Sequence, residues 1–561
     1  MTVVAGVDIG NATTEVAVLA GGRLLGVDRL PTRGRKGSAE SVHGAAALLR
    51  RAERRLGVQV ALASIAPLRA VDTATATVPA LPPRTGRLRV LTAGVATPGG
   101  TGTSVGQPLW LDDDRAGPSG GPRIVLVPPG LGYAAAADRV RRLLAAGVPV
   151  GAVLTAGDEG VLIANRLGAP VPVLDLVDTV AAGACPVLAV EVRPPGRPLT
   201  MLTDPVALGA ALGLGDAEAA DAVTLSRLLL DYSNAVIGLA ADGAGPPAED
   251  PAEADEPWLV AGGRRVPLRT ACAELAAWPA GTVTELSGVN GCGGDGGPAP
   301  VDDLFALDLG QVADAATARR GGTGRTVLVA SLHRTPAGLD HAALLGELTG
   351  HPVRGLISEP AAARLGALTT PGARPDAVVV DVGAGTIDVI APGGEVVVAG
   401  AGDLLTAAVA ETLGLPRAAA DWVKRGPCLR VTGSQQCEAE DGSHGFLDRP
   451  AAATALGMLA APGPAGLLPF DRRHSPAEWR ALRLRLKEAV FAANLRRALD
   501  GAAAAQVLIV GGPAGDDELL GVLLRSLGIT AGRGNVGGTL PGPPAGHRHA
   551  AALGLALAAA S

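Results

Sequence analysis

Residues 377–394 read Ala-Val-Val-Val-Asp-Val-Gly-Ala-Gly-Thr-Ile-Asp-Val-Ile-Ala-Pro-Gly-Gly. An apolar run, typical of a buried strand, ends at Asp381, whose carboxylate can hold a hydrated divalent cation. Gly383 and Gly385 let backbone N–H groups approach phosphate oxygens without a Cβ in the way, and Thr386 adds a hydroxyl donor. The stretch therefore predicts a strand that runs into a phosphate-binding turn.

The same pattern occurs near the amino terminus, where an apolar run ends at Asp8. In each copy a second acid follows the first by seven residues, Glu15 in one and Asp388 in the other, and opens a further apolar run. A tight turn and a third apolar run come next. We interpret these segments as a duplicated three-strand meander whose turns face each other across one nucleotide. The phosphate-binding residues predicted in the first turn are Gly10, Asn11, Ala12 and Thr13.

Two further glycine segments fit the same site. Gly400, Ala401, Gly402 and Asp403 open a predicted helix, whose N-terminus is suited to an anion. Gly511 and Gly512 follow a strand-like run. A helix predicted at 476–500 resembles the adenosine-side helix of the actin and heat-shock chaperone ATPases. This resemblance implies that adenosine lies against that helix, through Lys487, and against these two segments. The alternative for Lys487 is a solvated position on that helix.

The order of turn, turn, helix start and glycine pair favours an α/β fold with a duplicated actin-like (ribonuclease H-like) ATPase core. The chemistry of such a core needs two strand-end carboxylates that flank a cation, two loops of N–H donors and an acid that orients water. One Asp-x-Gly turn alone would more simply be a structural β-turn, but two matching copies argue against that explanation.

Composition excludes several classes of protein. The 561 residues are too many for one core, so we expect two to four domains. A net charge of −6 and 2% aromatic residues argue against nucleic acid as a partner. No apolar run approaches the roughly 18 residues of a membrane span, and no secretory signal is evident. Five cysteines without a C-x-x-C pair fit a reduced compartment, so we expect a cytoplasmic protein.

Strand and helix patterns alternate in residues 88–205, which we interpret as a small α/β module inserted into the first domain. Two Pro- or Gly-rich stretches, 244–256 and 288–300, predict surface loops. The expected organisation is a first part of the core at 1–87, the module at 88–205, core and linker at 206–376, and a second half at 377–561 with an irregular insert near 428–470.

The motifs resemble those of actin and the heat-shock chaperone ATPases. The segment Glu359-Pro360-Ala361-Ala362-Ala363 is similar to the chaperone segment whose glutamate helps to place the attacking water. This resemblance implies catalytic roles for Asp8, Glu359 and Asp381, with ATP or ADP and Mg²⁺ as cofactors. The alternative for Glu359 is a plain helix start with proline at its first position.

The chain as a whole resembles the large subunit of the diol (glycerol) dehydratase reactivases, ATP-dependent factors that release damaged cobalamin from adenosylcobalamin enzymes. The resemblance rests on 5–17, 97–100, 158–167, 366–372, 399–403 and 531–535. It implies that 88–205 is a swivelling domain. It also implies that Thr97, Asp158 and Asp175 hold Mg²⁺ at the contact with a separate small subunit. Without it, three loop-capping polar residues would explain these positions.

The resemblance also implies a hetero-oligomer whose client is a cobalamin-dependent dehydratase. Two other functions remain as alternatives: an actin-like nucleotide-binding scaffold that hydrolyses slowly or not at all, and a small-molecule kinase of the same superfamily. The presence of Asp8, Asp381 and Glu359 argues against the scaffold. The lack of a candidate general base argues against the kinase.

Overall fold

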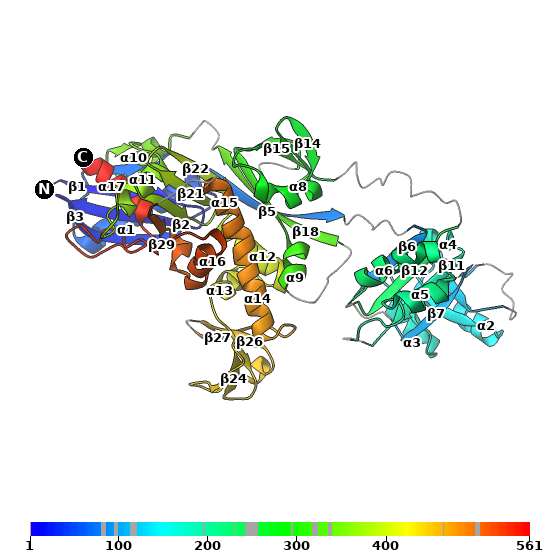
Figure 1. Cartoon of the computed structure of the whole chain (residues 1–561). Coiled ribbons are helices and arrows are strands. Elements are labelled where there is room, and N and C mark those ends of the chain that lie inside the picture. The colour runs from blue at the N-terminus through cyan, green and yellow to red at the C-terminus, as the bar shows by residue number, and fades with distance from the viewer. Residues whose placement is uncertain are drawn as a thin grey trace. The chain divides into compact units, whose positions relative to one another are not determined.

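A computed structural model describes most of the chain, which folds into two compact units. The first unit comprises Met1–Val78, Asp255–Thr317 and Thr326–Ser561, and the second comprises Pro79–Ala254 and Ala318–Arg325 (Figure 1). The described residues are 2–79, 86–94, 99–112, 120–194, 197–230, 232–241, 256–292, 296–316, 324–334, 339–463, 465–499 and 505–561.

The first unit contains two five-stranded sheets with the same topology. Three strands form an antiparallel meander, a fourth strand pairs in parallel with its first strand, and a fifth pairs in parallel with the fourth. The first sheet has the order β19-β4-β1-β2-β3, with β19 Val353–Arg354, β4 Leu62–Ile65, β1 Val3–Ile9, β2 Thr13–Ala20 and β3 Arg23–Pro31. The second has the order β22-β21-β20-β28-β29, with β22 Gly394–Ala399, β21 Thr386–Ala391, β20 Val378–Val382, β28 Val507–Val510 and β29 Ala531–Arg533.

The predicted duplicated meander is thereby confirmed, and its register explains the seven-residue spacing of the acids. Asp8 lies directly opposite Glu15 in the β1–β2 ladder. Asp381 lies opposite Asp388 in the β20–β21 ladder. Because residues opposite each other in antiparallel strands point to the same face, each turn carries a pair of acids on one side of its sheet.

Helices cover both faces of the first sheet. Helix α1, Ala39–Leu56, begins at Ser38, whose side chain accepts a hydrogen bond from Ser41 N, and ends at the left-handed Gly57. Its apolar face packs with α10, His341–Thr349, against β1 and β2. On the other face lie α11, Glu359–Ala367, and α17, Ala550–Ala560.

The α11–α17 contact is a close approach of two backbones. A Cβ built on Gly554 would lie 1.8 Å from the carbonyl oxygen of Ala362. One built on Gly366 would lie 2.0 Å from the carbonyl oxygen of Ala550. Only glycine fits at these crossing points, and the tight crossing fixes the amino end of α11, which begins at Glu359.

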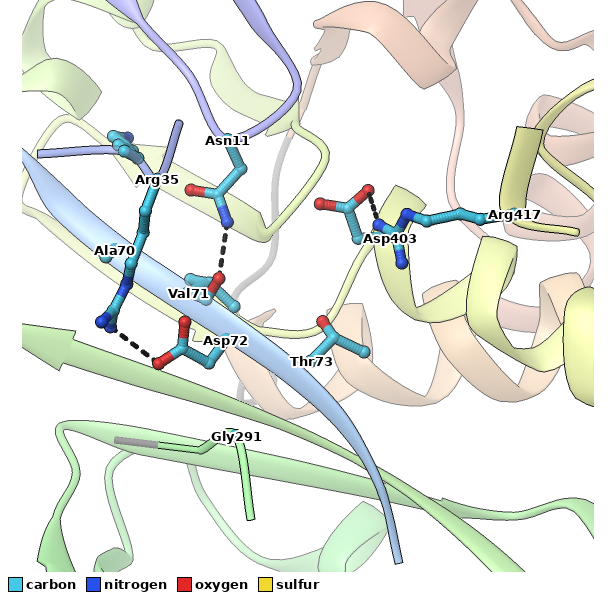
Figure 2. Close-up of a pocket in the computed structure, with 10 residues that line it drawn as sticks. Asn11, Arg35, Ala70, Val71, Asp72, Thr73, Gly291, Asp403 and Arg417 are labelled. Carbon is cyan, nitrogen blue, oxygen red and sulfur yellow. Dashed lines mark hydrogen bonds and ion pairs between the residues drawn. The ribbon is translucent and has the colours of Figure 1, made fainter. Parts of the chain in front are cut away.

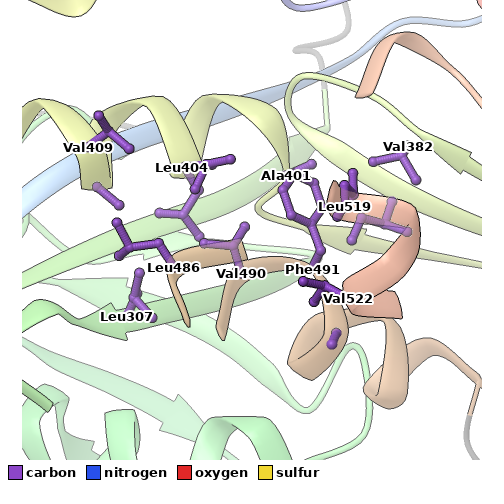
Figure 3. Close-up of a cluster of buried hydrophobic side chains, with 14 of the residues drawn as sticks. Leu307, Val382, Ala401, Leu404, Val409, Leu486, Val490, Phe491, Leu519 and Val522 are labelled. Atoms are coloured by element: carbon purple, nitrogen blue, oxygen red, sulfur yellow. The ribbon is translucent and has the colours of Figure 1, made fainter. Parts of the chain in front are cut away.

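The helices beside the second sheet surround the largest apolar cluster of the first unit (Figure 3). The predicted helix at 476–500 is continuous, but it contains a π-helical turn: α14 Pro476–Lys487, the π turn η4 Glu488–Ala492 and α15 Ala493–Leu499. Val490 and Phe491 of that turn pack with Ala401 and Leu404 at the start of α12, Gly402–Leu413, and with Leu519 of α16, Asp517–Leu527.

Two smaller sheets complete this part of the unit. One has the order β17-β18-β5, with β17 Asp303–Asp308, β18 Gly324–Arg334 and β5 Arg69–Pro79. The other has the order β14-β13-β15-β16, with β14 Arg264–Pro267, β13 Trp258–Ala261, β15 Val283–Ser287 and β16 Ala299–Pro300. Helices α8, Leu268–Glu274, and α9, Leu309–Ala316, follow β14 and β17.

The prediction of an irregular insert at 428–470 is wrong. These residues form a five-stranded antiparallel sheet of order β25-β24-β23-β26-β27, with β25 His444–Phe446, β24 Gln436–Ala439, β23 Leu429–Val431, β26 Leu459–Gly463 and β27 Gly466–Asp471. The buried guanidinium of Arg483 on α14 anchors this sheet through Glu440, at 2.8 and 2.9 Å. The same guanidinium bonds Glu518 of α16, at 2.7 and 2.9 Å.

The second unit is built on one seven-stranded sheet of order β10-β9-β8-β7-β11-β12-β6. Its strands are β10 Val173–Leu174, β9 Val150–Leu154, β8 Arg123–Leu126, β7 Gly102–Trp110, β11 Val187–Val192, β12 Asn234–Leu239 and β6 Leu88–Gly94. Its helices are α2 Tyr133–Ala145, α3 Gly160–Leu167, α4 Thr179–Gly183, α5 Pro205–Leu212 and α6 Ala219–Leu228.

The predicted end of this module at residue 205 is wrong. Strand β12 pairs with β11 on one side and β6 on the other, so residues up to 239 belong to the same sheet. Helices α5 and α6 bury Leu208 and Leu225 in the apolar cluster beneath it. Sequence reasoning assigned these helices to the main body because their pattern alone does not show which sheet they cover. Residues 244–255 and 293–295 of the two predicted loops lie outside the described residues.

Candidate functional site

The two glycine turns are built alike and touch each other. In each, the N–H of a glycine donates to a threonine carbonyl at 2.9 Å: Gly10 to Thr13, and Gly383 to Thr386. A Cβ on Gly385 would lie 2.6 Å from Nδ2 of Asn11, which itself donates to the carbonyl oxygen of Val71 at 2.7 Å. The prediction that the two turns face each other is therefore confirmed.

Carboxylates converge behind these turns. Burial, followed by repulsion from Glu359, raises the pKa of Asp8 well above its ordinary value. Burial and the neighbouring Asp388 and Glu359 do the same for the pKa of Asp381. Burial and Glu359 raise the pKa of Asp388 to about 7. Because a neighbouring acid raises the pKa of each of these three groups, the strand-end acids and Glu359 belong to one electrostatic cluster.

Lys36 lies among these acids, and sequence reasoning did not assign it to the site. Its Nζ lies 2.7 Å from Oε2 of Glu359, and its side chain is 7% exposed. Burial alone would lower the pKa of Lys36, but Glu359 and Asp8 outweigh this effect and raise it. One signal pointed to this residue: it is one of three lysines among 48 basic residues.

The acidic cluster fits a bound cation. Oδ1 of Asp388 is buried and accepts no hydrogen bond from any described residue. Besides burial, the neighbouring acid Glu359 raises the pKa of Asp388, so a cation would relieve the repulsion between the two groups. Among the residues that the structure describes, no three His, Cys, Asp or Glu side chains are placed as a direct ligand set. Mg²⁺ keeps several of its waters in proteins, so a cluster of carboxylates without a direct ligand set suits a hydrated Mg²⁺ held through water.

The amino end of α12 is not the open anion site that the sequence predicted. The N–H groups of Gly402 and Asp403 donate to the carbonyl oxygens of Gly383 and Ala384, at 3.3 and 2.7 Å. The Asp403 carboxylate is paired with Arg417 at 2.7 Å. These groups instead hold the second turn in place, because the turn's carbonyls satisfy the free donors of the first helical turn.

A polar pocket of about 210 Å³ opens beside the turns (Figure 2). Asn11 of the first turn and Asp403 of α12 line it from two sides. Its basic side chains are each held by an acid: Arg35 by Asp72 at 2.7 Å, Arg417 by Asp403 and Lys36 by Glu359. Its lining residues are Asn11, Arg35, Lys36, Ala70, Val71, Asp72, Thr73, Gly291, Asp403 and Arg417.

The adenosine-side residues have two different surroundings. Gly511 has φ +91°, and a Cβ there would lie 2.4 Å from Oδ1 of Asp381, so this glycine is required beside the strand-end acid. Gly512 follows at the start of a 3₁₀ turn. Lys487 is fully buried and pairs with Asp516 and Glu518 at 2.6 and 2.8 Å, so the alternative of a solvated position is wrong.

In the second unit the structure brings together two of the three residues predicted to bind metal. Asp158 and Asp175 follow the neighbouring parallel strands β9 and β10, and the carboxyl group of Asp158 is close enough to that of Asp175 to influence its titration. Burial is the main cause that raises the pKa of Asp175, and Asp158 adds to it. Thr97 lies outside the described residues, although Gly99 bridges to Val173 of β10.

Comparison with known proteins identifies the family. Residues 300–559 match the family profile described as diol dehydratase reactivase ATPase-like domain, and residues 91–243 match the DD-reactivating factor swiveling domain. A propanediol dehydratase-reactivating factor large subunit from Citrobacter freundii is 30% identical over 99% of this chain and 98% of its own length. The chain belongs to the dehydratase-reactivating factor large subunits.

Other reactivating factors are also similar to this chain over nearly its whole length. The diol dehydratase-reactivating factor large subunit of Klebsiella michiganensis is 28% identical over 99% of this chain and 98% of its own. A solved diol dehydratase-reactivating factor in nucleotide-free form is 26% identical, with a TM-score of 0.62 and 99% coverage of both chains. A solved glycerol dehydratase reactivase is 25% identical, with a TM-score of 0.62 and full coverage of both.

The resemblance and the fold class predicted from the sequence are thereby confirmed. The first unit carries the ATPase-like domain of the reactivating factors, and the second carries their swiveling domain. Within the part of the chain that the structure describes, no helix is both long and apolar enough to cross a lipid bilayer.

Proposed function

We propose that this chain binds ATP with Mg²⁺ between the two glycine turns and hydrolyses it. The observation that carries this proposal is the meeting of the turns above a shared cluster formed by Asp8, Asp381, Glu359 and Lys36. Two strand-end acids, two turns of backbone donors and one acid at a helix start are the parts that phosphoryl transfer to water needs.

Each part has a definite role in this proposal. The two turns hold the phosphates with backbone N–H groups and hydroxyls of Asn11, Ala12, Thr13, Gly385 and Thr386. Gly10 and Gly383, whose own N–H groups close the turns, let the phosphates approach because they have no Cβ. Bound Mg²⁺ would neutralise phosphate charge, and Asp8 and Asp381 would hold its water shell. Glu359 accepts a hydrogen bond from the attacking water, and Lys36 fixes the position of that carboxylate. Gly511, Gly512 and the buried end of α14 with Lys487 form the adenosine side.

The chain would use this hydrolysis as the large subunit of a reactivating chaperone. Its relatives are named reactivating factors of propanediol and diol dehydratases, and their name of large subunit implies a small one. A change of nucleotide would move the swiveling unit, alter affinity for the small subunit and release damaged cobalamin from a dehydratase in the cytoplasm. Asp158, Asp175 and Thr97 would hold a second Mg²⁺ at the small-subunit contact.

The test is release of cyanocobalamin from inactivated diol dehydratase by this chain with its small subunit. We expect release with ATP and Mg²⁺, none with a non-hydrolysable analogue, and none with Asp381→Ala. Asp376→Ala is the matched control, because that exposed acid pairs with the exposed Arg374 on the surface and should leave release unchanged. ATP hydrolysis without release would point to another client, and absence of hydrolysis would favour a nucleotide-binding scaffold.

A further inference from the structure

The loop between β22 and α12, residues 399–402, is held on one side by the second glycine turn. Besides the bonds of Gly402 and Asp403 described above, the N–H of Gly400 donates to the carbonyl oxygen of Gly385 at 2.8 Å. Gly400 has φ +91°, a conformation that needs a glycine. The position of the turn therefore depends on the position of this loop.

On its other side the loop is held by a cluster of three buried side chains, two of which bond to its backbone while the third links those two. Nδ2 of Asn494 donates to the carbonyl oxygens of Ala399 and Gly400, at 2.5 and 2.8 Å. Oδ2 of Asp303 accepts from the N–H of Ala399 at 2.9 Å. Arg497 links the two, since Nη1 donates to Oδ1 of Asn494 at 2.8 Å and Nη2 donates to Oδ1 of Asp303 at 2.8 Å.

These contacts close a ring that runs from Asp303 through the loop to Asn494 and Arg497, and back to Asp303. The three side chains are at most 5% exposed. The orientation of the Asn494 amide follows from the ring, because a flipped amide would set its oxygen against two carbonyls and its NH₂ against a guanidinium. A fully satisfied buried network of this kind fixes one conformation of the groups that it contacts.

We propose that Asp303, Asn494 and Arg497 are positioning residues of the nucleotide site: they set the geometry of the second phosphate turn through the loop 399–402. This inference rests on the proposed function where it is tested by ATP kinetics, whereas its test by hydrogen exchange does not depend on that function. The hydrogen bonds of these three side chains reach the backbone of the loop and each other, and the loop in turn bonds to the turn.

The π turn places two of these residues. Asn494 and Arg497 lie three positions apart on α15, so they share one helix face. The π turn just before them shifts the phase of that face relative to α14. Its Val490 and Phe491 lie in the same buried apolar cluster as Ala401 of the loop (Figure 3). The same helix thus packs beneath the loop and hydrogen-bonds to it.

The ring also reaches the strands that lead to the inserted unit. Asp303 begins β17, where it lies opposite Leu332 of β18, and β18 neighbours β5 in the sheet. Strand β5 runs up to the point where the chain enters the second unit at Pro79, and β18 begins at Gly324, within the return segment Ala318–Arg325. A shift of the second phosphate turn on nucleotide binding would be passed to this sheet through the Asp303 carboxylate.

The experiment compares Asn494→Ala with a matched control, Glu440→Gln. The control weakens another buried contact between an arginine and a carboxylate in the same unit, that of Arg483 with Glu440. The hydrogen bonds of Glu440 go to Arg483 and to the N–H of Cys428, away from the loop and the turn. Hydrogen exchange on the nucleotide-free chain is the structural readout. We expect at least tenfold faster exchange of the amides in 383–386 and 399–403 in Asn494→Ala, and parental exchange there in Glu440→Gln.

The activity readout is the affinity for ATP and the split between KM and kcat. We expect Asn494→Ala to raise the KM for ATP at least tenfold, while Glu440→Gln stays within twofold of the parent. Parental exchange and parental KM in a folded Asn494 variant would overturn the proposal. If Asn494→Ala does not fold, Asn494→Ser, which keeps one donor, takes its place under the same criteria. If the parent hydrolyses no ATP, the exchange comparison decides alone.

Discussion

Lys36 Nζ lies 2.7 Å from Oε2 of Glu359, although 323 residues separate them in the chain. The lysine comes from the segment after the first meander, and the glutamate begins a helix that packs on the far face of the same sheet. The ammonium opposes the rise in pKa that burial causes in Asp8, Asp381 and Asp388 alike. It therefore limits the repulsion among acids that a nucleotide-bound cation would otherwise have to overcome alone.

Replacing Lys36 by methionine should abolish most ATP hydrolysis while the fold persists. The pKa values of Asp8 and Asp388 would rise further without the ammonium, and Glu359 would lose the contact that orients it. A fall in kcat of about 10²–10⁴-fold is expected for a disturbed general base. Steady-state hydrolysis measures it, with Arg33→Met as the control at an exposed neighbouring cation. Parental turnover in the Lys36 variant would exclude this role.

Alanine at Gly385 should force the two glycine turns apart. Its Cβ would lie 2.6 Å from Nδ2 of Asn11 and 2.8 Å from Cβ of Val71, closer than real contacts allow. We expect ATP affinity to fall by at least tenfold in a binding titration, because both turns must reach the phosphates together. Gly393→Ala, in the next turn along the chain, meets no atom within 4 Å and should bind ATP as the parent does. Equal affinities for the two variants would contradict the prediction.

Alanine at Gly554 should destabilise the first unit. The new methyl group would meet the backbone of α11 at Ala362, where no side chain can move aside, so a loss of about 1–3 kcal/mol or more is expected. Gly209→Ala on α5 is the helical control, since no atom lies within 4 Å of its Cβ and alanine favours a helix by about 0.5–1 kcal/mol. Urea unfolding measures both, and an unchanged midpoint for Gly554→Ala would contradict the tight crossing.

His547 should make the fold less stable as pH falls. Burial, then repulsion from Arg548 and Arg533, lowers its pKa to about 4 from 6.5. Between pH 6.5 and 4 the unfolded chain therefore binds more protons at this position than the folded chain does. The fold is most stable above pH 6.5, where the ring is neutral in both states, and loses stability progressively as pH falls through this window. Solvent screening reduces the effect, because the ring is only partly buried.

The measurement for His547 is urea unfolding at pH 7.5 and pH 5, for the parent and for His547→Gln. The parent should lose more stability than the variant between the two pH values. A variant with the same pH dependence as the parent would show that the ring titrates normally in the folded state.

Much of the core could be predicted from the sequence because its signals are local. Each meander lies in one continuous segment, residues 3–31 in the first copy and 378–399 in the second. The spacing of Asp8 from Glu15 follows from the register of one hairpin. The insert sheet at 428–470 could not be predicted in this way. Its strands are three to six residues long and interrupted by Gly, Pro and Ser, so neither alternation nor length marks them.

The candidate site was predictable where one segment supplies all its parts, and not where distant segments meet. The sequence predicted that the turns Gly10–Thr13 and Gly383–Thr386 meet, because each turn carries its own glycine and threonine pattern, and in the structure they touch. Lys36 was missed because its place in the site comes from its ion pair with Glu359, and only folding brings these two distant residues together. The amino end of α12 looked like an anion site because sequence cannot show that the carbonyls of Gly383 and Ala384 already occupy its donors.

The three lysines have a practical consequence for experiments on this protein. Each is engaged by acids, and their side chains are 7%, 14% and 0% exposed for Lys36, Lys424 and Lys487. Reagents that acylate primary amines, including the common cross-linkers and fluorescent esters, would find almost no reactive side chain on the folded molecule. Rapid modification of Lys36 would instead report that the nucleotide site had opened, so its amine is a built-in probe of that event.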